Sequence, residues 1–143
     1  KKYVNLMIYL IFQITTLVNS REHPIKSEKQ LRAIVRVGQA VNLSVERFAS
    51  VGEAMGDDNP EIRSEMNDAC KEARAAGLLI EQLCDCGPDE SGQFRSYADK
   101  SAMVRAARAL LSSVTRVLLI ADTVVVKQLL SAKDRVSFGC FGN

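Results

Sequence analysis

The chain has 143 residues, enough for one domain of ordinary size with a buried core. Hydrophobic residues make up 47%, aromatic residues only 6%, and Trp does not occur, so we expect an aliphatic core. The net charge is +2, and no basic stripe is interleaved with aromatic residues, which argues against a nucleic-acid binder. Few Gly and Pro residues, 8 and 3, favour long helices over a fold with many turns.

The first segment, KKYVNLMIYLIFQITTLVNS at 1–20, has no initiator Met, and we expect the chain to be part of a longer protein. Apolar residues recur at helical spacing over 3–19, which predicts a mostly buried helix. Two lysines before an apolar run also fit the alternative of a signal peptide or membrane anchor. Polar residues interrupt the run and the small residues of a cleavage site are missing, so we expect no membrane span.

The second predicted helix follows a polar break at Pro24 and runs from a cap at Ser27 to about Met55. Its apolar and glycine positions alternate at spacings of three and four, a heptad seam that predicts packing against another helix. The seam consists of Leu31, Ile34, Gly38, Val41, Val45, Phe48, Gly52 and Met55. Because glycine disfavours helix, Gly38 and Gly52 on the seam predict a close neighbouring helix.

The third predicted helix begins in GDDNPE, where Asn59 suits the cap and Pro60 the first helical position. Its seam has the same spacing and reads Ile62, Met66, Ala69, Ala73, Ala76, Ile80 and Leu83. Three central alanines predict a thin helix that packs closely. Cys70 falls on the apolar side and is expected to be a small buried side chain.

The last predicted helix covers about 99–135, after a long loop at 84–98. It is longer than the two helices before it, so we expect it to overhang them. One seam reads Met103, Ala107, Leu110, Val114, Val117, Ala121 and Val124, and a second reads Val104, Leu111, Leu118 and Val125. Further apolar residues at 119, 120, 126, 129 and 130 widen this surface toward the C-terminus. Such a helix requires another helix to cover it.

Charge is unevenly distributed, with −7 over 57–90 and +5 over 91–143. Opposite signs on successive helices favour their antiparallel packing. Arg105, Arg108 and Arg116 lie near one face of the last helix and have two interpretations. They pair with the acidic third helix, which we favour, or they bind an acidic partner.

Residues that carry chemistry are scattered. The single His, His23, lies in a predicted loop, and the hydroxyl residues of the last helix have no His near in sequence to activate a nucleophile. Cys84 and Cys86 form one C-x-C without a second pair to complete a zinc site. We therefore expect no enzyme, no cofactor and no metal.

The stretch MVRAARALLSSVTRVLLIAD at 103–122 resembles the long helix of the N-terminal domain in the vinculin/α-catenin family. AVNLSVERFASVGEAM at 40–55 and DACKEARAAG at 68–77 resemble the helices before it. The resemblance covers about 13–136. It implies an all-α fold, an antiparallel up-down four-helix bundle whose long last helix is normally shared with a second bundle.

The resemblance also divides the chain. Residues 1–20 are an N-terminal helix whose first twelve residues are atypical, 26–136 form the family-like bundle, and 137–143 are an atypical tail. In the tail, Gly139 and Gly142 are expected to interrupt the helix. The actin-binding part of the family does not lie in these residues, so actin filaments would be reached only through the rest of the parent protein.

The resemblance implies a non-enzymatic adaptor of adhesion and the cytoskeleton, located in the cytoplasm and at cell junctions. In α-catenins the corresponding bundle pairs with itself or with a helical segment of β-catenin. The expected partner-binding or dimerisation residues are Leu31, Ile34, Val41, Val45 and Phe48. The alternative is a scaffold for exchange factors of the Rho pathway, without binding to β-catenin.

Overall fold

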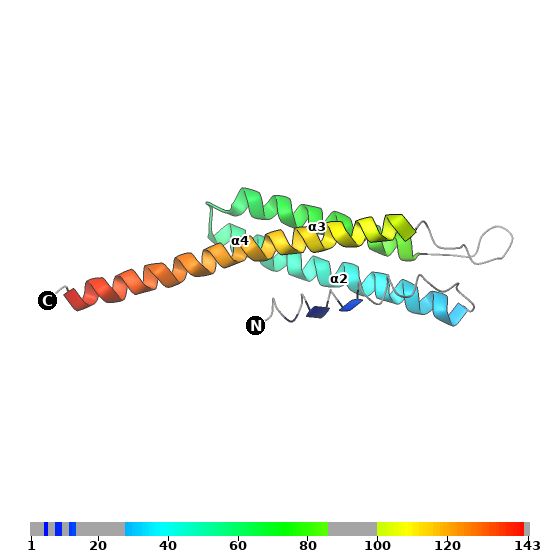
Figure 1. The fold of residues 1–143 in the computed structure, drawn as a ribbon, viewed down its shortest axis with the longest axis horizontal. Coiled ribbons are helices and arrows are strands. Elements are labelled where there is room, and N and C mark those ends of the chain that lie inside the picture. Colours follow the sequence, from blue (N-terminus) through cyan, green and yellow to red (C-terminus); the bar gives the residue numbers. More distant parts are fainter. Residues whose placement is uncertain (1–4, 6–7, 10–11, 14–27, 86–99, 142–143) are drawn as a thin grey trace.

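The computed structural model describes residues 5, 8–9, 12–13, 28–85 and 100–141, and within these the chain is helical with no strand. Three long helices account for most of it: α2 at Glu28–Asp58, α3 at Arg63–Cys84 and α4 at Lys100–Phe141. Helix α3 packs against both α2 and α4, whereas α2 and α4 approach each other little. The sequence prediction of an all-α fold with these three helices is therefore confirmed (Figure 1).

Helices α2 and α3 run antiparallel and approach closely at glycine positions, as the seam predicted. A Cβ atom added at Gly38 would lie 2.7 Å from Cys84 Cβ, and one added at Gly52 would lie 2.9 Å from Cys70 Sγ. On the facing helix, a Cβ at Gly77 would lie 3.1 Å from Val45 Cβ. Larger side chains at these positions would force the two helices apart.

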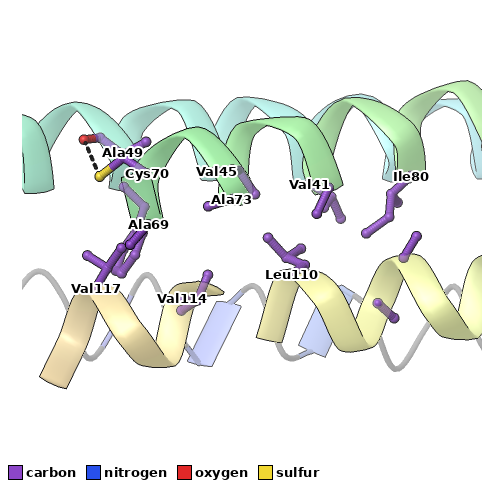
Figure 2. Packing of buried hydrophobic residues seen from close by; sticks show 14 of the residues in the cluster. Val41, Val45, Ala49, Ala69, Cys70, Ala73, Ile80, Leu110, Val114 and Val117 are labelled. Atoms are coloured by element: carbon purple, nitrogen blue, oxygen red, sulfur yellow. Dashed lines mark hydrogen bonds between the residues drawn. The ribbon is translucent and has the colours of Figure 1, made fainter. Parts of the chain in front are cut away.

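The core lies where α2, α3 and α4 meet. The predicted seam of α3 and the first predicted seam of α4 contribute to it, and Leu111 and Leu118 of the second α4 seam are partly buried against it. Figure 2 shows Leu110, Val114 and Val117 of α4 facing the small side chains of α3. The fully or nearly buried apolar residues of α3 and α4 are Met66, Ala69, Cys70, Ala73, Ala76, Ile80, Cys84, Met103, Ala106, Ala107, Leu110, Val114, Val117, Ile120, Ala121 and Val124. The prediction that Cys70 is buried is confirmed.

The turn between α2 and α3 differs from the prediction. Helix α3 begins at Arg63, its N-cap position is Ile62, and no side chain caps it. The Asn59 side chain instead donates a hydrogen bond back to the carbonyl oxygen of Met55 in α2, at 2.9 Å. The prediction of Asn59 as the cap of α3 is wrong because its amide satisfies the end of the preceding helix, and a turn over 60–62 separates it from α3.

The first predicted helix, 3–19, lies mostly outside the described residues. Those that are described, 5, 8–9 and 12–13, are helical. Ile8 is 61% exposed, although the apolar pattern placed it among the buried positions of a buried helix. Phe12, another apolar side chain of this stretch, is 67% exposed.

Helix α4 continues further than predicted. It has 42 residues, about 63 Å at 1.5 Å per residue, and extends past the turn that joins α2 to α3 (Figure 1). The predicted overhang is thus confirmed. Gly139 does not interrupt the helix, which runs to Phe141. One glycine costs a helix only about 1 kcal/mol relative to alanine, too little to end it. Gly142 lies outside the described residues.

Candidate functional site

The predicted partner-binding residues of α2 lie inside the core. Val41, Val45 and Phe48 are fully buried, and Ile34 is 8% exposed. The side chain of Leu31 lies outside the part of the chain that the structure describes. In Figure 2, Val41 points into the space that Leu110 enters from α4. A partner could reach this seam only if the helices separate.

Beside the buried seam of α2, ion pairs that the sequence analysis did not predict connect α2 to α3. The Arg74 guanidinium of α3 donates to both carboxylate oxygens of Glu46, at 3.0 and 3.1 Å, and also pairs with Glu53. The signal was available, since Glu46 and Glu53 are one heptad apart on α2 and so share a face. The Asn42 amide donates across the same interface to Glu81. These contacts hold α2 and α3 together as one hairpin.

The three predicted arginines do not form a single group. Arg116 donates to Glu72 of α3 at 2.8 Å. Arg105 and Arg108 are exposed, and no ion pair joins either of them to another residue of the described ranges. Arg116 therefore takes part in contact with the acidic helix, while the other two point to solvent.

A second pair joins Lys127 of α4 to Glu61, which lies in the turn just before α3. Glu61 and Glu72 are as far apart in sequence as their partners Arg116 and Lys127. Both ion pairs are therefore consistent with one antiparallel register. Beside Lys127, an open hollow of about 500 Å³ lies between the turn at Asn59 and the departing helix, lined also by Gln128 and Ser131.

Two side chains with potential reactivity, Ser113 and Cys70, form hydrogen bonds to backbone carbonyl groups of this chain. The Ser113 hydroxyl donates to the carbonyl oxygens of Ala109 and Leu110, both at 2.9 Å. Burial raises the pKa of the Cys70 thiol, whose sulfur donates to the Ala49 carbonyl oxygen at 3.4 Å (Figure 2). A thiol in that state is a poor nucleophile. Within the described ranges no group of His, Cys, Asp and Glu could hold a metal ion; His23 lies outside them.

By length and composition alone, the stretch Ser101–Lys133 of α4 could cross a membrane; it was the one such stretch among the described residues. Core helices of globular proteins pass the same test. Here one seam of the stretch, from Met103 to Val124, is buried against the other helices. We therefore assign it to the bundle.

The sequence model of the vinculin family matches residues 2–138. The chain belongs to the vinculin family. Among curated proteins it is 47% identical to human alpha-catulin over 134 residues, which is 91% of this chain. It is 35% identical to catenin alpha of Drosophila melanogaster over 86% of the chain, and 32% identical to human catenin alpha-2 over 85%. No solved structure matched.

The vinculin-family relatives are much longer than this chain, which spans 18% of alpha-catulin and 13% of the two catenins. The similarity covers the three described helices and most of the preceding segment. The family membership expected from residues 40–55, 68–77 and 103–122 is therefore confirmed. What the whole relatives bind or organise is a separate matter.

Proposed function

We propose that this chain is a protein-interaction module of a non-enzymatic adhesion and cytoskeletal adaptor. The observation that carries the proposal is the buried seam of α2, in a chain that belongs to a family containing the catenins. The module is an antiparallel four-helix bundle in which residues 3–19 supply the fourth helix. It works in the cytoplasm at cell junctions, and actin filaments are reached through other parts of the longer protein.

The mode of binding follows from burial. Val41, Val45 and Phe48 are inaccessible in the closed structure, so a partner helix binds them by entering the bundle. Since the α2–α3 hairpin is held by glycine contacts and by Arg74, separation occurs most easily elsewhere, by movement of α4 or of the first helix. The partner is an amphipathic helical segment of the β-catenin type, or a second copy of the bundle.

Entry of a partner predicts an inverse relation between stability and affinity. A partner that binds only the open bundle gains affinity when the closed form is weakened. Leu110→Ala weakens the packing of α4 without changing any residue of α2, so it should lower the melting temperature and tighten binding of β-catenin's helical segment severalfold. Titration calorimetry measures the affinity, with Leu129→Ala, at an exposed position of the same helix, as the control.

Two results would contradict this proposal. One is no complex between the unmodified chain and the segment at about 50 µM, a level at which a weak regulatory interaction is still detected. The other is equal or weaker binding by Leu110→Ala, since docking on the closed surface gains nothing from a looser core. In the first case the alternative, a scaffold for Rho-pathway exchange factors, is favoured if a pull-down recovers an exchange factor but no catenin. The 47% identity to alpha-catulin, which is higher than the identity to the catenins, supports retaining this alternative.

A further inference from the structure

Beside its buried seam, each of α2 and α4 has a second stripe of half-buried apolar residues. These residues are Val37, Ala40 and Val51 on α2 and Val104, Leu111 and Leu118 on α4. Val37, Leu111 and Leu118 pack against the core from outside. Half-buried apolar side chains at helical spacing on two neighbouring helices indicate a surface that a further helix covers.

Both second stripes lie on the side of their helix that faces away from α3. On α2, Glu46 and Glu53, which pair with Arg74 of α3, lie on one side of the buried seam, and the stripe lies on the other. On α4, Arg116 and Lys127 mark the α3 side in the same way. Since α2 and α4 run in the same direction (Figure 1), the two stripes border one surface, here named the α2–α4 face.

One exposed arginine stands at each edge of the α2–α4 face. Arg47 lies four residues before Val51, and Arg108 lies three residues before Leu111, so each shares the side of its stripe. Both are exposed, and no ion pair joins either of them to another residue of the described ranges. Residues 3–19, which the proposed function places on this face, contain no charged side chain, so they bring no carboxylate to either arginine.

We propose that Arg47 and Arg108 select the partner helix, and that this helix is amphipathic with carboxylates on both flanks of its apolar face. The inference rests on the proposed function, in which a partner helix enters the bundle, and adds where that helix lies and which chemistry it has. The partner replaces residues 3–19 on the α2–α4 face, and one flanking carboxylate meets each guanidinium group. A helix with basic flanks would place like charges together and is rejected.

Asp122 gives the α2–α4 face a direction. It is an exposed residue that follows Leu118 on the stripe of α4, 14 residues after Arg108. At 1.5 Å per residue the two lie about 21 Å apart along the helix, too far to form an ion pair. The basic part of the face is thus the part distant from the turn at 59–62. The carboxylates of the partner should therefore lie on the half that is nearer the start of α4.

Two synthetic amphipathic peptides of about 18 residues, or five helical turns, test the proposal. They share one apolar face of leucine and alanine and carry glutamate on both flanks in one peptide and lysine in the other. Calorimetric titration into the full chain should show the glutamate peptide binding about tenfold more tightly at low salt. The difference should shrink in about 0.5 M salt. The double variant Arg47→Glu/Arg108→Glu should reverse the preference.

Lys71→Glu is the matched control, since it makes the same charge change at an exposed position of α3 and should leave the preference unchanged. Circular dichroism verifies that each variant is folded. Equal affinity for the two peptides, or a preference that the double variant retains, overturns the proposal and leaves both arginines as solvated side chains. Binding of neither peptide at about 50 µM overturns it as well.

The proposed function fails by a different result, which is no complex between the unmodified chain and β-catenin's helical segment. If that segment binds and the double variant binds it equally well, only the role of Arg47 and Arg108 is wrong. If the segment does not bind but the glutamate peptide does, and the double variant reverses that preference, the face takes an acidic helix of another protein.

Discussion

The two parts of α4 on either side of Val124 have similar composition and opposite surroundings. Before Val124 the helix buries one seam against α2 and α3, and beyond it every described side chain is exposed. Both parts are rich in Val and Leu. Apolar composition alone therefore does not tell which part of a long helix is packed within the same chain.

The difference has its cause in the neighbouring helices. Helix α3 begins at Arg63, after the turn that follows α2, and the pair of Glu61 with Lys127 sets the level of that turn on α4. Past this level neither α2 nor α3 continues (Figure 1). Among the side chains of α4 that the structure describes, up to Lys133, Val124 is the last buried one.

The largest expected difference in stability is between two leucine-to-alanine substitutions in α4, one before Val124 and one after it. Leu110→Ala empties a fully buried site and should lower the free energy of unfolding by about 2–5 kcal/mol. Leu129→Ala removes an exposed side chain and should change it by less than about 0.5 kcal/mol. Urea denaturation at micromolar concentration measures both. Equal losses would mean that the overhang is covered within the monomer, contrary to this comparison.

A smaller effect is expected from overfilling the packed part. Ala73 is fully buried on α3 between its two neighbours, so Ala73→Leu should cost about 1–3 kcal/mol. Ala75→Leu, on the exposed side of the same helix turn, should cost less than about 0.5 kcal/mol. Thermal denaturation of the two variants gives the comparison. An unchanged melting temperature for Ala73→Leu would remove Ala73 from the core.

The smallest effect concerns charges on the packed part of α4. Arg116→Glu replaces an ion pair with Glu72 by a repulsive pair, but at 39% exposure of the arginine side chain the loss should be at most about 1 kcal/mol. Arg108→Glu should leave stability unchanged. Raising the salt concentration should reduce the Arg116 effect. A loss that salt does not reduce would point to packing rather than charge.

Helix spacing was enough to predict α2, α3 and α4, their seams and the close contacts at Gly38 and Gly52. These predictions succeed because seam periodicity reports directly which face is buried. The ion pairs of Arg74 were not predicted: the spacing of Glu46 and Glu53 shows that they share a face of α2, but their partner depends on the relative register of two helices, which no single helix encodes. The prediction that Asn59 caps α3 was wrong for a similar reason, because the end of α2 and the start of α3 compete for the same side-chain amide.

The partner-binding residues illustrate another limit. Ile34, Val41, Val45 and Phe48 were chosen from the seam and from family resemblance, and the structure places them in the core. Burial by itself is what a plain core residue also shows. Their role as a binding site stays a prediction until the bundle is opened by a partner.

The turn at 59–62 has a consequence for how such a chain could change over time. It fixes the level at which α4 becomes exposed, while the sequence of α4 is apolar on both sides of that level. Seven residues added to both α2 and α3 beside this turn would preserve the seams, and the covered face of α4 would then include Gln128 and Ser131, which continue the buried seam after Val124 at the same spacing. Both side chains are polar, so an insertion at this turn would lengthen the core only together with apolar substitutions in α4 itself.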